Sequence, residues 1–397
     1  MTASPPWRFL APAYSPVSAA SLVGALKGLA GGQSGGVEEW LAQRYEVDAT
    51  FLVDSGTSAL RLAIQSLATA GSPRVRVALP AFGCYDLATA AIGAGADVSF
   101  YDLDPLTLGP QWESLGDTLA SGVDAVVLVH QYGVPVDVDR VRVLADAHGA
   151  LVIEDAAQGA GARWRHRRLG ARGDLGVLSF GRGKGMTAGG GGALLATGPR
   201  GQHLLAAARA RVTSGGRGVG SIARLVVQAA LSNPLLYGVP ARMPFLGLGD
   251  TPYHEPWEPR RIAAAQAGVV EAAAVLADEE AATRRIAAAR LAAALRGQRG
   301  ITLIEPPSVE GTLPGWLRFP VVLDGDARGR AGGSAFRRLG IIPGYPRPLP
   351  VLPVFGHAAR SVAWPGAARL AAGLVTLPTH RWVAPGDTDA AVALLRD

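Results

Sequence analysis

Residues 150–192 begin ALVIEDAAQGAGA (150–162) and continue, after a basic segment, as GDLGVLSFGRGKGMTAGGGG (173–192). The apolar run 150–153 is typical of a buried strand and ends in two carboxylates, Glu154 and Asp155. A second apolar run, 175–180, also predicts a strand, and it leads to Lys184. The carboxyl ends of strands in α/β sheets form the crevice that binds ligands. We therefore expect Asp155 and Lys184 to face a ligand.

The lysine and the acid suggest a specific chemistry. Lys184 is the only lysine after Lys27 in a chain whose other cationic side chains are all arginine, and only lysine can form a Schiff base. Pyridoxal 5'-phosphate (PLP) requires a lysine amine for its aldehyde and a carboxylate for its ring nitrogen. Asp155 suits the ring nitrogen. Ser179, five residues before Lys184, suits the phosphate of the same cofactor.

A second phosphate-binding element precedes this stretch. Residues 50–53 predict a strand, and Gly56 and Thr57 follow it in a turn that opens a helix. Glycine lets the backbone approach a phosphate, and a helix N-terminus offers free N–H groups. An ordinary capped helix would carry the same residues. We favour the phosphate site because the chain also contains Asp155, Ser179 and Lys184.

Five segments together resemble the DegT-type (DegT/StrS) family of PLP-dependent nucleotide-sugar aminotransferases. They occur in the family's order, covering 15–200 closely and 255–397 more loosely, and they read DSGTSAL (54–60), DAVVLVHQYGVPVDVD (124–139), IEDAAQGAGA (153–162), SFGRGK (179–184) and LPTH (377–380). The resemblance implies catalytic Lys184 and Asp155, a PLP cofactor and fold type I. It also implies a homodimer with active sites at the subunit interface.

The resemblance assigns further cofactor contacts. Gln158 is expected to hydrogen-bond the phenolic oxygen of the ring. The family's ring-stacking aromatic falls on Cys84 here, and we assign its role to the neighbouring Tyr85. An acid usual in the family's glycine run is replaced by Gly190. No metal site is expected.

Strands that alternate with helices from 50 to 200 predict an α/β domain with a mainly parallel sheet. With the resemblance, the fold class is a large PLP-binding domain with a mainly parallel seven-stranded sheet between helices, plus a smaller α+β C-terminal domain. We expect the large domain over 1–255 and the connecting helix and small domain over 256–397. The connecting helix is predicted over 260–296. Tyr345, Arg347 and His357 are interpreted as solvated residues of a Pro-rich loop.

Residues 198–256 form an unusually long apolar insertion in the large domain. Its prolines and arginines exclude a membrane-spanning helix. We expect packing in a dimer interface or over the site mouth, with contact between 220–250 and a membrane surface as the alternative.

The predicted function is transfer of an amino group from L-glutamate or L-glutamine to a keto sugar, nucleotide-linked, in polysaccharide or secondary-metabolite biosynthesis. Two alternatives remain. One is another PLP reaction on the same scaffold, as in a lyase, dehydratase or cyclase, although the dehydratase branch replaces the lysine by histidine. The other is a non-catalytic sensor or scaffold.

Bulk composition narrows the class of protein. The 397 residues are 49% hydrophobic and 18% charged, which indicates a folded chain with a large core. The net charge of +6 comes from scattered arginines, without the basic stripe interleaved with aromatics that nucleic-acid binding requires. The single cysteine excludes an intrachain disulfide. No secretory signal is apparent, and we expect a cytoplasmic protein.

Overall fold

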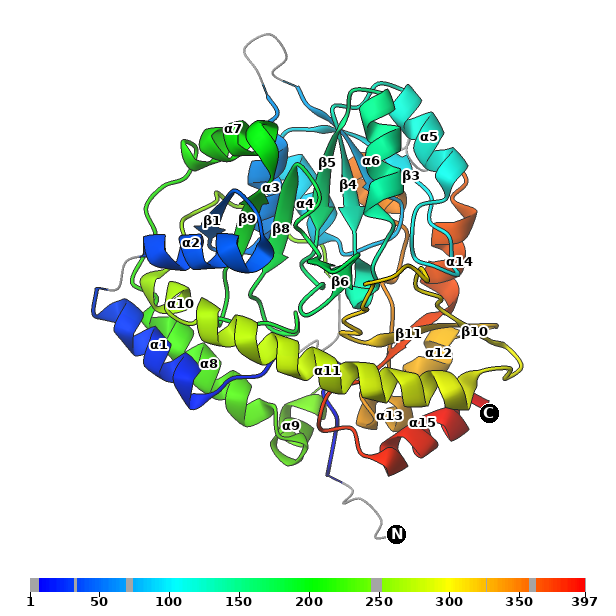
Figure 1. The fold of residues 1–397 in the computed structure, drawn as a ribbon. Coiled ribbons are helices and arrows are strands. Elements are labelled where there is room, and N and C mark those ends of the chain that lie inside the picture. Colours follow the sequence, from blue (N-terminus) through cyan, green and yellow to red (C-terminus); the bar gives the residue numbers. More distant parts are fainter. Residues whose placement is uncertain are drawn as a thin grey trace.

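The computed structural model describes residues 7–31, 34–68, 74–243, 252–325, 327–356 and 362–396. Its centre is a seven-stranded sheet in the order β1-β9-β8-β5-β4-β2-β3. Every neighbouring pair from β8 to β3 is parallel, and β9 is antiparallel to both β1 and β8. The prediction of a mainly parallel seven-stranded sheet is confirmed (Figure 1).

The strands of the large sheet are short and buried. Their bounds are Ala49–Val53 (β1), Arg76–Pro80 (β2), Asp97–Tyr101 (β3), Ala125–Val129 (β4), Leu151–Asp155 (β5), Leu175–Ser179 (β8) and Gly192–Ala196 (β9). A separate two-stranded ribbon comprises Arg163–Trp164 (β6) and Arg167–Arg168 (β7). The apolar runs of the sequence therefore became the central strands, as strands covered on both faces require.

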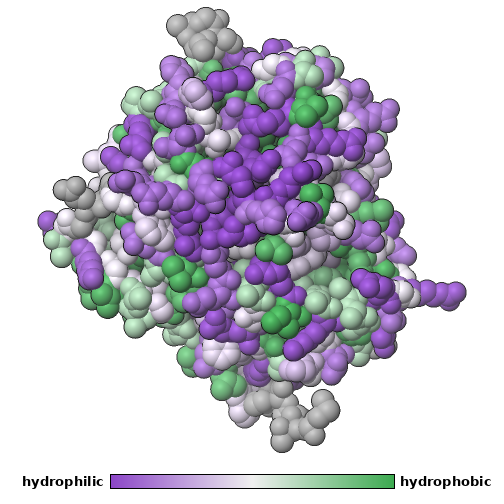
Figure 2. All heavy atoms as spheres, viewed as in Figure 1, coloured by the Kyte–Doolittle hydropathy of each residue, from purple (hydrophilic) through white to green (hydrophobic). Residues whose placement is uncertain are grey.

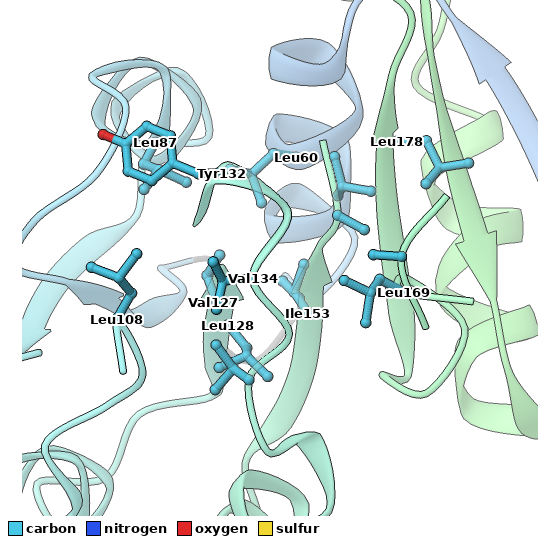
Figure 3. Close-up of a cluster of buried hydrophobic side chains, with 14 of the residues drawn as sticks. Leu60, Leu87, Leu108, Val127, Leu128, Tyr132, Val134, Ile153, Leu169 and Leu178 are labelled. Atoms are coloured by element: carbon cyan, nitrogen blue, oxygen red, sulfur yellow. The ribbon is translucent and has the colours of Figure 1, made fainter. Parts of the chain in front are cut away.

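Helices cover both faces of the sheet. Their bounds are Ser34–Tyr45 (α2), Gly56–Gln65 (α3), Asp86–Gly93 (α4), Trp112–Ala120 (α5), Val138–Ala147 (α6) and Gly198–Arg209 (α7), with a short 3-10 turn at Gln131–Gly133 (η1). Helix α3 packs against β8 and β9, and α6 packs against β4 and β5. Figure 3 shows the buried side chains that join these layers, including Leu60 of α3, Val127 of β4 and Ile153 of β5.

A second, antiparallel sheet lies in the C-terminal part of the chain, in the order β10-β11-β13-β12. The elements there are Ile301–Leu303 (β10), Phe319–Leu323 (β11), Ala327–Ala331 (α12), Ser334–Arg338 (α13), Ile342–Pro343 (β12), Leu349–Val351 (η3), Pro353–Phe355 (η4), Pro365–Gly373 (α14), Leu374–Leu377 (β13) and Pro385–Arg396 (α15). These elements form the expected small α+β region. The division of the chain at residue 255 stays a prediction.

The predicted helix over 260–296 is interrupted. A short helix, α10 (Ala264–Ala267), is followed by α11 (Val270–Leu295), and α1 (Ala19–Leu29) crosses at the break. A Cβ on Gly268 would lie 2.1 Å from the carbonyl oxygen of Gly24, so the two backbones meet where neither residue has a side chain. Close packing of α1 therefore accompanies the break in the expected helix.

The insertion is helical. It contains α8 (Val219–Leu231) and α9 (Pro234–Ala241) within the described residues. No single described helix is long and apolar enough to cross a membrane. Helices α8 and α9 satisfy the length and composition only as a pair, and the pair is bent by 106°.

Candidate functional site

A cavity opens at the carboxyl ends of β4, β5 and β8. Its lining residues are Gly56, Thr57, Leu60, Cys84, Asp86, Leu87, Val129, Asp155, Ala157, Gln158, Ser179 and Lys184. Six of the seven predicted site residues belong to this set. The exception is Tyr85. The sequence therefore located six residues around one cavity, although these residues lie on three separate segments of the chain.

Asp155 is the last residue of β5 and is aligned with Val129 on one neighbouring strand and Val177 on the other. Its side chain is buried, and Oδ1 accepts a hydrogen bond of 2.9 Å from the backbone N–H of Ala157. Burial raises the pKa of Asp155 above the ordinary value, although the Ala157 hydrogen bond and the positive charge of Lys184 act in the opposite direction. A cationic partner at this carboxyl group would stabilise its ionised form.

Lys184 lies in the loop after β8, between two glycines with left-handed backbones, Gly183 (φ +75°) and Gly185 (φ +81°). Ser15 and Arg284 contact this loop at Gly185. The backbone N–H of Gly185 donates to Ser15 Oγ at 3.0 Å, and a Cβ on Gly185 would lie 2.8 Å from Nη1 of the buried Arg284. Glycine is required on both sides of the lysine because other residues rarely adopt this conformation.

The turn before α3 and the end of β8 form a cradle for an anion. Ser55 caps the helix, and its Oγ accepts a 3.0 Å hydrogen bond from the N–H of Ser58. The N–H groups of Gly56 and Thr57, in the first turn, have no intrahelical acceptor. A Cβ on Gly56 would lie 2.8 Å from Cβ of Ser179, so the turn and the serine touch. A helix N-terminus beside a hydroxyl suits a phosphate group.

Gln158 is fixed by two hydrogen bonds. Its Oε1 accepts from the backbone N–H of Tyr132 at 2.9 Å, and its Nε2 donates to the hydroxyl of Tyr345 at 2.8 Å. The Tyr345 ring stacks on Tyr132, with centroids 6.0 Å apart, and meets Phe82 edge to face at 5.4 Å. Tyr345 is buried, so its interpretation as a solvated loop residue is wrong. Arg347 is exposed, and His357 lies outside the described residues.

The structure does not bring Tyr85 into the cavity. Tyr85 is the residue before α4 and is buried, whereas Cys84, Asp86 and Leu87 line the cavity at this turn. Cys84 and Leu87, three residues apart, share one face of this helical turn, and Tyr85 does not line the cavity. The aromatic place of the resemblance is therefore occupied by a thiol and an aliphatic side chain. Burial, followed by the charge of Asp86, raises the pKa of the Cys84 thiol to about 12.

His130 and Glu154 form a buried pair behind the cavity, and neither lines it. The Nε2 atom of His130 lies 2.9 Å from Glu154 Oε1, and its Nδ1 accepts the backbone N–H of Val136. Glu154 also accepts backbone N–H groups from Gly170, Arg172 and Gly173. Burial alone would raise the pKa of Glu154, but these hydrogen bonds hold it below the ordinary value. The pair joins the end of β4, which leads into η1, to the end of β5, where Asp155 lies.

In the glycine run after Lys184, the side chain of Gln266 fills the space beside Gly190. Gly190 has φ +132°, and a Cβ there would lie 2.5 Å from Nε2 of Gln266. The buried amide of Gln266 therefore occupies the space beside the position where the resemblance expects an acid.

The residues around the cavity fit PLP. Lysine, carboxylate and phosphate cradle occur together, and position 56, where a Cβ would lie 2.8 Å from Cβ of Ser179, accommodates only glycine. Comparison with known proteins agrees. The sequence model of the DegT/DnrJ/EryC1/StrS aminotransferase family matches residues 24–219.

The chain belongs to this family. The DegT-family aminotransferases depend on PLP, which confirms the predicted cofactor.

Two curated relatives illustrate the range of substrates within the DegT family. One is an L-glutamine:2-deoxy-scyllo-inosose aminotransferase from Streptoalloteichus tenebrarius, 36% identical over 36% of this chain and 33% of its own length. The other is a dTDP-3-amino-3,4,6-trideoxy-alpha-D-glucose transaminase from Streptomyces venezuelae, also 36% identical, over 43% of this chain and 44% of its own. The chain therefore aligns with less than half of either relative.

A solved structure extends the likeness to nearly the whole chain. The crystal structure of S. venezuelae DesV in complex with a ketimine intermediate is 25% identical. It covers 95% of this chain and 93% of its own, with a TM-score of 0.73. The DegT-family fold therefore includes the C-terminal region that the family model does not reach.

Proposed function

We propose that this DegT-family protein is a PLP-dependent aminotransferase that moves an amino group from L-glutamate or L-glutamine to a keto sugar. The observation that carries the proposal is the meeting of Lys184, Asp155 and the Gly56–Ser179 contact around one cavity. Each satisfies a separate requirement of the cofactor, and together they draw on three segments of the chain.

When bound, PLP supplies an aldehyde and an electron-withdrawing ring that stabilises negative charge on a neighbouring carbon. Lys184 Nζ would hold the cofactor through its aldehyde, and the free amine of Lys184 would serve as the base for the Cα proton of the amino donor. Asp155 accepts a hydrogen bond from the ring nitrogen and keeps it protonated.

The remaining residues orient the cofactor. Gly56 and Thr57 donate backbone N–H groups to the phosphate, and Ser179 adds a hydroxyl. Gln158 donates the second hydrogen of its Nε2 to the phenolic oxygen of the ring, since the first is directed to Tyr345. Tyr85 does not line the cavity, so we assign the face of the ring to Cys84 and Leu87 instead.

The acceptor that we propose is a nucleotide-linked keto sugar, with a role in polysaccharide or secondary-metabolite biosynthesis. The names of the relatives support a cyclic polyhydroxy ketone as the class, because one is named for a keto cyclitol and another for a dTDP-linked sugar. The homodimer implied by the resemblance is part of the same proposal. Sedimentation velocity of the purified chain tests it, and a monomer at micromolar concentration would contradict it.

A visible absorbance spectrum tests the proposed reaction. The purified protein, supplied with PLP, is expected to show the band of lysine-bound cofactor, and L-glutamate or L-glutamine is expected to bleach it to the pyridoxamine form. Lys184→Ala should lose the band and the half-reaction while retaining the fold by circular dichroism. A band indifferent to both donors would favour a lyase or cyclase. If no band formed even with added PLP, the protein would be a non-catalytic member of the family.

A further inference from the structure

Helices α8 and α9 present an apolar surface to the outside of the molecule. The face comprises Val219, Val226, Val227, Leu235, Leu236 and Val239, of which Val219, Val227 and Val239 are 64%, 55% and 60% exposed. We refer to these six residues as the α8–α9 face. Single exposed apolar side chains are ordinary, but six on two consecutive helices mark a site of interaction.

The opposite side of α8 is firmly packed, so the helix is not merely detached from the protein. Ser221 and Leu225 are buried, and a Cβ on Gly189 would lie 2.9 Å from the carbonyl oxygen of Ser221 and 3.0 Å from Cγ of Leu225. Thr187 Oγ1 donates to Gln228 Oε1 at 3.2 Å. Positions 221, 225 and 228, which make these contacts, follow helical spacing. The exposed residues therefore face outward because α8 is seated on residues 185–191, which lead from Lys184 to β9 and which we call the hairpin after Lys184.

Neighbouring segments extend the apolar surface. Helix α1 packs on α8 and exposes Val23 and Leu26, with the exposed Lys27 beside them. Trp7 is 53% exposed, and a Cβ on Gly238 of α9 would lie 2.0 Å from its carbonyl oxygen. Figure 1 places α1, α8 and α9 along one side of the molecule, below the large sheet. In Figure 2, hydrophilic residues cover the middle of the view. The lower part of the view is a mixture of hydrophilic and apolar residues.

The charged side chains of the segment that contains this face are all positive. From residue 175 to residue 249 the sequence contains no aspartate or glutamate, whereas it contains Arg182, Lys184, Arg200, Arg209, Arg211, Arg217, Arg224 and Arg242. Arg217 and Arg224 are exposed immediately before and within α8. An apolar face on a segment whose charged side chains are all cationic is complementary to an anionic partner.

Two occupants could cover such a face, and the charge distinguishes them. In a two-fold dimer whose axis passes through this face the patch meets itself, so a second copy would bring Arg217 and Arg224 toward their own counterparts with no acid from this stretch between them. An anionic lipid surface offers hydrocarbon for the valines and leucines and phosphates for the arginines. Helix α8, of 13 residues, is about 20 Å long at 1.5 Å per residue, against about 30 Å for a bilayer core.

We propose that the α8–α9 face binds an anionic lipid surface, with both helices lying in the plane of the interface and Arg217 and Arg224 contacting headgroup phosphates. The 106° bend between the helices lets each one lie flat along its own direction. Because α8 is seated on the hairpin after Lys184, the cavity would lie close to the membrane surface. This inference concerns where the protein binds and stands whether or not the proposed aminotransfer is correct.

Vesicle co-sedimentation of the full-length protein tests the proposal. We expect recovery with vesicles of phosphatidylcholine containing about a third phosphatidylglycerol to exceed recovery with phosphatidylcholine alone by about tenfold, and to fall as salt is added. The double variant Val227→Glu/Leu236→Glu should lose about tenfold or more of this binding. Arg217→Gln/Arg224→Gln should lose the preference for anionic vesicles.

Val143→Glu is the matched control. Val143 is 69% exposed on α6, in a different part of the molecule, so the same change there should leave vesicle binding unaltered. Circular dichroism checks that each variant is folded. The proposal would be overturned by a wild-type protein that ignores anionic vesicles, or by equal binding of wild type and Val227→Glu/Leu236→Glu. Loss of self-association by that variant in sedimentation velocity, with vesicle binding unchanged, would also overturn it and assign the face to a second copy.

Discussion

The side-chain amide of Gln158 donates a hydrogen bond of 2.8 Å to the hydroxyl of Tyr345, 187 residues further along the chain. Gln158 follows β5 of the large sheet, and Tyr345 follows β12 of the small sheet. This contact joins the C-terminal region directly to a side chain that lines the cavity.

Tyr345→Phe tests the value of this contact. The ring and its stacking on Tyr132 are retained, but one hydrogen of the Gln158 amide loses its acceptor. A neutral hydrogen bond contributes about 0.5–1.5 kcal/mol, so we expect kcat/KM to fall about three- to tenfold with little change in Tm. Steady-state kinetics measure the loss. Tyr45→Phe, which removes a buried hydroxyl from α2, is the control and should keep wild-type kinetics.

Gly56→Ala should weaken PLP binding. The added Cβ would lie 2.8 Å from Cβ of Ser179 and 3.1 Å from its Oγ, so the turn and the serine must separate. Overpacking of this kind costs about 1–3 kcal/mol, which predicts a PLP affinity lower by about tenfold or more. Gly116→Ala in α5 meets nothing within 4 Å and should leave PLP affinity unchanged. Equal affinities in a PLP titration of the two variants would contradict the cradle.

PLP binding should depend on pH through Asp155. Burial raises the pKa of this carboxyl group in the cofactor-free protein, and a bound pyridinium would lower it, so binding favours the ionised form. As the pH falls through the raised pKa, the carboxyl group must first lose a proton, and affinity should decline by about tenfold per further pH unit. The advantage of wild type over Asp155→Asn should therefore be greatest near neutral pH and vanish in acid. An advantage independent of pH would show that the carboxylate does not pair with the ring.

Cys84 should be unreactive in the native protein although it lines the cavity. With a pKa of about 12, its thiolate fraction at pH 8 is about one in ten thousand. We expect a thiol reagent to react on the order of a thousandfold more slowly than with the urea-unfolded chain. The chain has one cysteine, so the measured rate belongs to this residue alone. Rapid native labelling would contradict the raised pKa of this half-buried thiol.

The site was predictable where a side chain follows directly from a strand. Asp155 and Ser179 end strands whose apolar runs are plain in the sequence, and parallel neighbours place such ends at one edge of the sheet. Lys184 could be found because the chain contains so few lysines. These predictions needed only local pattern, together with the resemblance that named the cofactor.

The remaining features depend on contacts between distant segments. Nothing near Tyr345 indicates that its Pro-rich loop meets Gln158, and the loop was interpreted as solvated. Tyr85 was preferred to Cys84 because it is aromatic, but the chain is already helical at this turn and directs Tyr85 elsewhere. The break at Gly268 is likewise associated with the close approach of α1, which no pattern within 260–296 reveals.

The seating of α8 on the hairpin after Lys184 has a thermodynamic consequence. One face of this helix contacts Gly189 and Thr187, and the other is exposed. If covering the exposed face stabilises one arrangement of the hairpin, cofactor affinity changes by some factor. Linkage then requires that cofactor change the affinity of the helix for its partner by the same factor. A partner bound to the exposed face of α8 would thus change the affinity of the cavity for its cofactor, and the cofactor would change the affinity of that face for its partner.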